Sequence, residues 1–136
     1  MGGDQGLLLF VCIQNAGRSQ MAEAFAKGLG LEAMSAGTVP AKALNPVVVE
    51  VMREKGYDLS ANKPKMLTME MIEAARLVVT MGCSVDSVCP KPMLAMMQKK
   101  LIDWDLEDTK GKSIQEVRRI RDEIATRVAG LVQAGP

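Results

Sequence analysis

The sequence predicts an α/β fold: a single three-layer domain in which helices cover both faces of a four-stranded parallel sheet. Apolar segments of strand length alternate with segments whose apolar residues recur at helical spacing. Residues 77–81, Leu-Val-Val-Thr-Met, are rich in β-branched side chains, as expected for a strand buried on both faces. A length of 136 residues and a hydrophobic content of 48% suffice for one core. We therefore expect one domain over residues 1–136.

Local signals place the individual elements. The strands are predicted at residues 7–10, 31–35 and 77–81, with a short fourth strand beginning at 101–102. The helices are predicted at residues 19–29, 46–56, 69–73 and 114–131. Asn45, Thr68 and Ser113 are the expected N-caps, because their side-chain oxygens can accept hydrogen bonds from the free N–H groups of a first helical turn. The last helix is expected to turn Arg118, Arg119 and Arg121 mainly towards solvent.

Composition excludes several classes of function. The 17 basic and 16 acidic residues give a net charge of +1, so no nucleic-acid or membrane partner is expected. No apolar stretch approaches the roughly 20 residues of a membrane span, and the N-terminus lacks a signal-peptide pattern, so we expect a cytoplasmic protein. The chain has no histidine, which removes the usual general base, the common zinc ligand and every Cys-His catalytic pair.

The segment from Cys12 to Ser19 is the strongest functional signal. It lies between the first strand and the first helix, where the free N–H groups and partial positive charge of a helix N-terminus suit an oxyanion. A thiol placed there beside a guanidinium loses its proton more easily, and the thiolate is the nucleophile. Arg18 can present its planar guanidinium to the same anion, Gly17 permits a backbone conformation closed to other residues, and Ser19 can cap the helix or donate to the Cys12 sulfur. The predicted oxyanion-binding loop comprises Ile13, Gln14, Asn15, Ala16, Gly17 and Arg18.

Each of these residues has an ordinary alternative. Cys12 could be a small core residue that ends a strand, and Arg18 a solvated cation at a helix start. The combination Cys-x5-Arg-Ser, placed after a strand and before a helix, favours the functional interpretation, because structural context is what confirms a motif.

The same residues carry a resemblance to a known family. The segment Cys12-x5-Arg18-Ser19 resembles the phosphate-binding loop of the low-molecular-weight protein tyrosine phosphatase superfamily. The segment from Asn15 to Glu23 is similar to the arsenate reductases of that superfamily, in which Gln usually follows Arg-Ser where the phosphatases have Pro. The likeness continues through residues 35–38, 45–46, 77–83, 89–90 and 103–108, and so covers nearly the whole chain.

The resemblance implies an arsenate reductase. The Cys12 thiolate would attack the arsenic of arsenate, for which phosphate and sulfate are analogues, held by loop N–H groups and Arg18. Four carboxylates crowd the segment 103–108, and physical reasoning alone does not choose a general acid among them. By resemblance the acid is Asp108, which the family usually follows with Pro and this chain follows with Thr109.

Cys83 and Cys89 lie on a long predicted connection, residues 82–100. They could be buried small residues or part of a metal site, but a metal would need a third good ligand, and among soft donors only Cys12 remains. Reactive thiols on a loop beside a catalytic cysteine favour redox use. We expect Cys83 to attack Cys12, Cys89 to attack Cys83, and a thioredoxin-like partner to reduce the resulting disulfide, with no bound cofactor or metal.

Two alternative functions remain open. A phosphatase of phosphotyrosine or small phosphate esters would use only Cys12, Arg18 and Asp108, and a non-catalytic oxyanion-binding redox sensor would use the cysteines as a switch. Whichever function applies, we expect the protein to be a monomer. In some relatives the positions of Asn15, Glu23 and Ser35 bind or border a potassium ion. Because Lys63 and Lys65 occur in the connection that completes that site, our hypothesis is that a lysine ammonium replaces the ion here.

Overall fold

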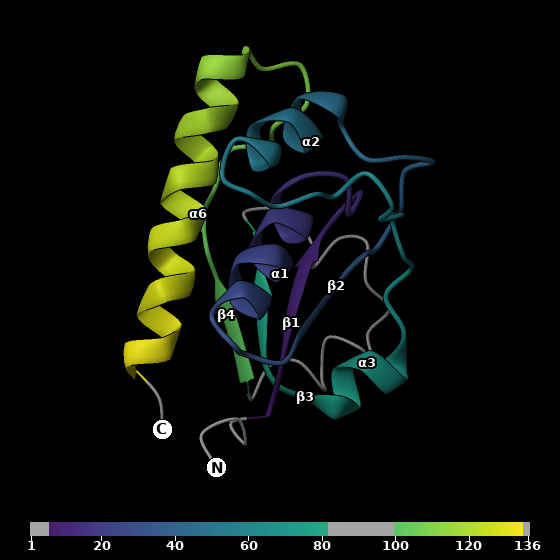
Figure 1. Ribbon diagram of the computed structural model, residues 1–136. Coiled ribbons are helices and arrows are strands. Elements are labelled where there is room, and N and C mark those ends of the chain that lie inside the picture. The colour runs from purple at the N-terminus through teal and green to yellow at the C-terminus, as the bar shows by residue number, and fades with distance from the viewer. Residues whose placement is uncertain (1–5, 82–99, 135–136) are drawn as a thin grey trace.

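The computed structural model describes residues 6–81 and 100–134. Its sheet contains strands β1 (Leu7–Cys12), β2 (Ala33–Gly37), β3 (Ala75–Thr80) and β4 (Leu101–Asp103), all parallel and in the order β2-β1-β3-β4 (Figure 1). The helices are α1 (Arg18–Gly28), α2 (Pro46–Arg53), α3 (Met69–Ala74) and α6 (Ile114–Ala134). The predicted fold class is confirmed. None of the helices in these described ranges is long and apolar enough to cross a membrane.

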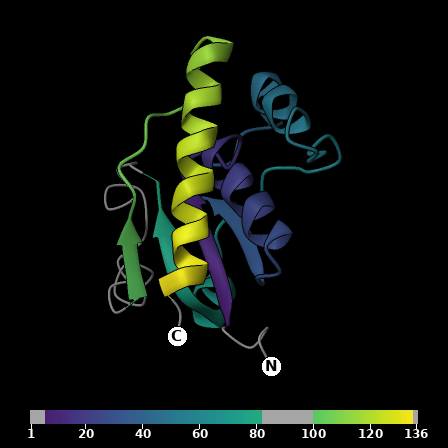
Figure 2. The same cartoon turned by 60° about the vertical axis from the view of Figure 1, so that its left-hand side comes forward.

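Side chains of β1 alternate between two hydrophobic clusters, one on each face of the sheet. Leu8 and Phe10 belong to a large cluster shared with α1, α2 and α6, whereas Leu9 and Val11 pack with α3 and β3 on the opposite face. Figure 2 shows α6 lying across the first face of the sheet beside α1. Because β1 is buried on both faces, its apolar run is unbroken, as the sequence predicted.

Strand order places the carboxyl end of β1 at a switch point. The chain leaves β1 for β2 on one side and later returns to β3 on the other side. In open parallel sheets, ligands bind beyond the carboxyl ends of the strands at such a point. The loop between β1 and α1 lies there, and it begins at Cys12.

The three expected N-caps are confirmed. Asn45 Oδ1 accepts from the Val47 N–H at 2.9 Å, and Thr68 Oγ1 accepts from the Met71 N–H at 3.2 Å. Ser113 and Glu116 form a reciprocal capping box, in which the Glu116 N–H donates to Ser113 Oγ at 3.2 Å and the Ser113 N–H donates to Glu116 Oε1 at 3.0 Å. Each cap satisfies a backbone donor that a helix start leaves unpaired.

The start of β2 and the position of Ser19 differ from the predictions. Strand β2 begins two residues later than predicted, because its register pairs Ala33 with Leu8 and Gly37 with Cys12. Helix α1 begins at Arg18, with Gly17 as N-cap and the Gly17 carbonyl accepting from Met21 N–H at 3.0 Å. Ser19 therefore lies inside the first turn and is not the cap. Most of the predicted connection 82–100 lies outside the described residues.

The prediction that Arg121 faces solvent is wrong. Only 5% of the surface of this residue is exposed, and it lies between α6 and α2. Its guanidinium donates to the Val51 carbonyl at 3.0 Å and to Glu54 Oε1 at 2.8 Å. Arg118 donates to both oxygens of the same carboxylate. The hydrogen bonds from Arg118 and then Arg121 lower the pKa of Glu54 to about 2, so this carboxylate fastens the end of α2 to α6.

We expect Glu54→Gln to lower the melting temperature at neutral pH by a few degrees, because the amide cannot pair with two guanidinium groups. The stabilisation belongs to the ionised carboxylate, so it is complete above the ordinary pKa of 4.5 and disappears as the pH falls towards about 2. Thermal unfolding across this range should show the difference from the original chain shrinking. The control is Glu123→Gln, which removes an exposed pair with Arg127 and should have little effect at any pH. A difference independent of pH would contradict the assignment.

Candidate active site

A pocket opens at the carboxyl end of β1. Three segments line it: residues 12–14 and 16–18 in and around the β1–α1 loop, residues 41 and 43–46 before and at the start of α2, and residues 108–111 after β4. The predicted oxyanion-binding loop therefore forms one wall of a cavity built from distant parts of the chain.

Hydrogen bonds turn the carbonyl groups of the loop outwards. Backbone N–H groups bind five of them: Thr38 N to Cys12 O at 3.3 Å, Val39 N to Ile13 O at 2.8 Å, Ala41 N to Gln14 O at 3.0 Å, Asn45 N to Ala16 O at 2.9 Å, and Met21 N to Gly17 O at 3.0 Å. In a planar trans peptide the N–H points away from the preceding C=O. The N–H groups that follow these carbonyls are thus directed into the loop, where an oxyanion would accept them.

Cys12 lies at the base of this loop with 2% of its surface exposed. Its Sγ accepts a hydrogen bond from the Asn15 N–H at 3.2 Å and lies 2.9 Å from Ser19 Oγ. Of the two roles expected for Ser19, the structure shows the contact with sulfur. The Asn15 N–H is thus directed at the sulfur, and a hydrogen bond to a charged acceptor is stronger than one to a neutral acceptor.

Arg18 is 5% exposed and reaches the pocket from the first residue of α1. Its NH1 donates to the carbonyls of Met81, after β3, and Leu106, after β4, the latter at 3.0 Å. Its NH2 lies 3.8 Å from Asp108 Oδ1. The main chain at two strand ends therefore holds the guanidinium in place before a ligand arrives, which reduces the ordering cost of binding.

Of the four carboxylates in the segment 103–108, the structure places Asp108 on the pocket wall. Its side chain is 56% exposed, and Oδ1 accepts from the Lys110 N–H at 3.2 Å. Asp103 instead accepts from Thr80 Oγ1 at 2.7 Å, and Glu107 pairs with Arg119 at 2.7 Å. Asp108 thus combines access to a ligand with proximity to Arg18.

Thr109 occupies the position where the family usually has Pro, and it is buried. Its carbonyl accepts from Asn45 Nδ2 at 3.4 Å, and its side chain lies so close to Gly17 that a Cβ at position 17 would overlap Thr109 Oγ1. Gly17 has a φ of −148°, so this close approach, rather than a left-handed backbone, requires glycine. The left-handed residue of the loop is Asn15, with a φ of 53°.

Asn15 holds the loop from within, as predicted. It is fully buried, and its Nδ2 donates to Ser19 Oγ at 2.8 Å. Its Oδ1 accepts from the Lys65 N–H at 2.9 Å and from Gln20 Nε2 at 3.0 Å. Sequence reasoning used Gln20 only as a family marker and missed this contact. No local signal marks Gln20, because Arg18 and Ser19 in the same first turn are polar as well.

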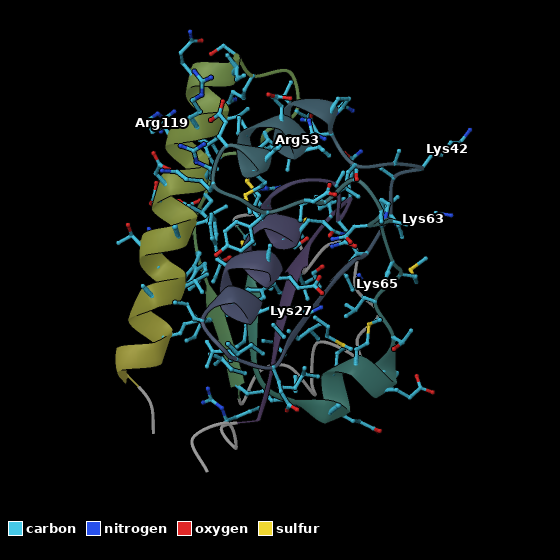
Figure 3. All side chains as sticks on the ribbon, viewed as in Figure 1. Lys27, Lys42, Arg53, Lys63, Lys65 and Arg119 are labelled. Atoms are coloured by element: carbon cyan, nitrogen blue, oxygen red, sulfur yellow. The ribbon has the colours of Figure 1, made fainter. Side chains whose placement is uncertain are left out.

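Glu23 and Ser35 lie next to each other, and Ser35 Oγ donates to Glu23 Oε1 at 2.6 Å. Lys27 Nζ is 2.7 Å from Glu23 Oε2, and Lys65 Nζ is 3.9 Å from Glu23 Oε1. The two lysines come from α1 and from the segment before α3, on one side of the molecule (Figure 3). Within residues 6–81 and 100–131, no group of three or more Cys, Asp or Glu side chains could hold a metal ion.

Cys83 and Cys89 lie outside the described residues, so the structure does not place them relative to Cys12.

The loop, its arginine and the parallel sheet agree with a known family. The family model of the low molecular weight phosphotyrosine protein phosphatases matches residues 7–134. The chain belongs to this family. Its relatives include a putative arsenate reductase of Halobacterium salinarum, 39% identical over an alignment of 130 residues that covers 90% of this chain and 87% of that protein.

Two solved structures are similar to the chain. The YwlE arginine phosphatase from Geobacillus stearothermophilus has a TM-score of 0.83 and 27% identity, over 94% of this chain and 91% of that one. The thioredoxin-dependent arsenate reductase of Corynebacterium glutamicum has a TM-score of 0.75 and 38% identity, over 95% of this chain and 61% of that one. Proteins named for these two different chemistries therefore share the fold of this chain.

We expect Gly37→Ala to weaken phosphate binding by about tenfold or more and to lower the free energy of unfolding by about 1–3 kcal/mol. A Cβ at this last residue of β2 would lie 2.6 Å from Ile13 O and 3.0 Å from Asn15 N, both in the loop backbone. Isothermal titration calorimetry and urea unfolding measure the two effects. Gly130→Ala, in α6 where a Cβ meets open space, is the control and should leave phosphate binding unchanged. Normal phosphate affinity in Gly37→Ala would show that the close packing of β2 does not shape the loop.

Proposed function

We propose that this protein is an arsenate reductase that uses Cys12 as nucleophile and a disulfide relay through Cys83 and Cys89. The observation that carries the proposal is the position of the Cys12 sulfur, at the base of a loop whose N–H groups are directed inwards, in a pocket that Arg18 also lines. The reductases among its relatives support arsenate as the oxyanion.

In the first step the Cys12 thiolate attacks arsenic, and one arsenate oxygen leaves. The loop N–H groups and Arg18 bind the remaining oxygens and stabilise the negative charge that develops on them. Asp108 protonates the departing oxygen, which leaves as water. The product is a covalent bond between the Cys12 sulfur and arsenic(V).

In the second step the Cys83 thiolate attacks the Cys12 sulfur. The S–S bond forms as the S–As bond breaks, its electron pair stays on arsenic, and arsenite is released. Cys89 then attacks Cys83, which frees the Cys12 thiolate and leaves a Cys83–Cys89 disulfide. Because two thiols have been oxidised for each arsenate reduced, an external dithiol of the thioredoxin class restores the starting state.

The composition of the pocket favours a small oxyanion over phosphotyrosine. Its described lining contains aliphatic and polar side chains and no aromatic ring that could stack on a tyrosine. Trp104 is buried against Phe10, with ring centroids 6.0 Å apart, and Tyr57 packs edge-on against Phe25. The chain's one tryptophan and one tyrosine thus serve the core.

We expect the protein to oxidise NADPH in the presence of arsenate, thioredoxin and thioredoxin reductase. Cys83→Ser and Cys89→Ser should each abolish this turnover, because each variant lacks one thiol of the relay. In a single turnover without reductant, arsenate should consume two thiols per chain in the original protein, as titrated with a thiol reagent.

Hydrolysis of an aryl phosphate by the same three proteins is the control, because it needs only Cys12, Arg18 and Asp108. Equal hydrolysis together with loss of arsenate turnover would show that the variants keep an intact pocket. No arsenate turnover by the original chain, with steady phosphate hydrolysis in all three proteins, would instead identify a phosphatase such as its arginine phosphatase relative.

We further propose that the Lys65 ammonium takes the place of a potassium ion beside Glu23. Arsenate turnover should then be unchanged when potassium replaces sodium at constant ionic strength. Lys65→Ala leaves Glu23 and Ser35 without this cation, so its turnover should rise with potassium. Lys63→Ala is the matched control, because Lys63 contributes its carbonyl and not its ammonium to the contacts around Gln20. A strong potassium response in the original chain would contradict the proposal.

A further inference from the structure

Gln20 is fully buried in the first turn of α1, and its amide orientation is determined by its neighbours. One end of the amide lies 3.3 Å from the Lys63 carbonyl oxygen. A backbone carbonyl can only accept a hydrogen bond, so the atom that faces it is the nitrogen, Nε2. The same nitrogen donates to Asn15 Oδ1 at 3.0 Å, while Oε1 accepts from Asn62 Nδ2 at 3.2 Å.

The orientation of Asn15 follows in the same way. The Lys65 N–H, which can only donate, lies 2.9 Å from one end of the Asn15 amide, so that end is Oδ1. Gln20 donates to the same oxygen. The other end is therefore the nitrogen, and it donates to Ser19 Oγ at 2.8 Å.

The Ser19 hydroxyl has a single proton, and the contacts of Ser19 Oγ determine where that proton points. Asn15 already donates to Ser19 Oγ, so this oxygen acts as acceptor on that side. Its other contact is Cys12 Sγ at 2.9 Å, to which the hydroxyl proton can donate. The chain of contacts therefore directs the Ser19 hydroxyl proton at the Cys12 sulfur, and this hydrogen bond is strongest when the sulfur is charged.

From this we infer that Gln20 is a positioning residue, which acts with the main chain of residues 63 and 65 to orient Asn15 and Ser19 so that Ser19 donates to the Cys12 sulfur. The inference rests on the proposed function in taking Cys12 as the nucleophile. It adds that a segment outside the pocket, residues 63–65, sets the direction of hydrogen bonding that reaches the reactive atom.

The test measures the reactivity of Cys12 without arsenate or a reductant. Every variant is made in a chain carrying Cys83→Ser and Cys89→Ser, so that iodoacetamide alkylates Cys12 alone, forming an S–C bond and releasing iodide. The rate as a function of pH gives a midpoint for the reactive thiolate. The charged groups that share the pocket with Cys12 are Arg18, Asp108 and Lys110, and none of the variants changes them.

Ser19→Ala should raise the midpoint by about one pH unit, because the last donor of the chain is lost. Gln20→Met, of similar size and without an amide, should raise it by a smaller amount. The double variant should shift the midpoint no further than Ser19→Ala alone, since Gln20 acts through Ser19. A general loosening of the loop would instead make the two shifts add.

Two matched comparisons separate this role from a merely structural one. Asn62→Ala removes a bond to Gln20 Oε1 but leaves both hydrogen bonds that Gln20 Nε2 donates in place, so the midpoint should not change even where the melting temperature falls. Lys65→Pro removes the N–H that donates to Asn15, and should raise the midpoint more than Lys65→Ala, which keeps that N–H. This pair tests the inference even where Gln20→Met does not fold.

An unchanged midpoint in Gln20→Met, additive shifts in the double variant, or equal midpoints in the two Lys65 variants would each overturn the inference. Alkylation requires no arsenate turnover, so the role of Gln20 can be confirmed even if the protein is a phosphatase. Conversely, the protein can be an arsenate reductase even if Gln20 has no such role.

Discussion

The outward anchoring of the loop carbonyls is the constraint on which the rest of the site depends. A short loop has no helix or sheet to satisfy its backbone, and here the segment 38–45 supplies most of the donors. Because the N–H and C=O of a trans peptide point in opposite directions, outward-facing carbonyls require the N–H groups of the same peptides to face into the loop. The affinity for an anion is thus built from the main chain, and the side chains at positions 13, 14 and 16 need no charge to contribute.

The parallel sheet brings the other components to the same place. Arg18 begins α1, yet carbonyls that follow β3 and β4 hold its guanidinium. Asp108 arrives from the segment after β4, and Asn45 links that segment to the loop through its contacts with Ala16 and Thr109. All of these groups meet at one edge because parallel strands end on the same side, next to the switch in strand order.

Buried polar side chains then orient the nucleophile. Asn15, Ser19 and Gln20 are inaccessible to solvent and satisfy one another or nearby backbone groups. Such a network is costly when incomplete, because each unpaired buried group loses its hydration without compensation. When complete, the network allows few alternative side-chain conformations. The Cys12 sulfur is therefore held in one orientation, as a nucleophile requires.

The amino-acid sequence by itself determined the α/β class, the N-caps and the loop around Cys12 and Arg18, because these depend on local periodicity, local hydrogen bonding and a compact motif. The register of β2 and the burial of Arg121 could not be predicted, since each depends on partners distant in the sequence. The same holds for the contacts of Gln20 and Thr109. Only the tertiary structure decided them, because the energy of a buried polar group depends on which donors and acceptors the fold places within hydrogen-bonding distance.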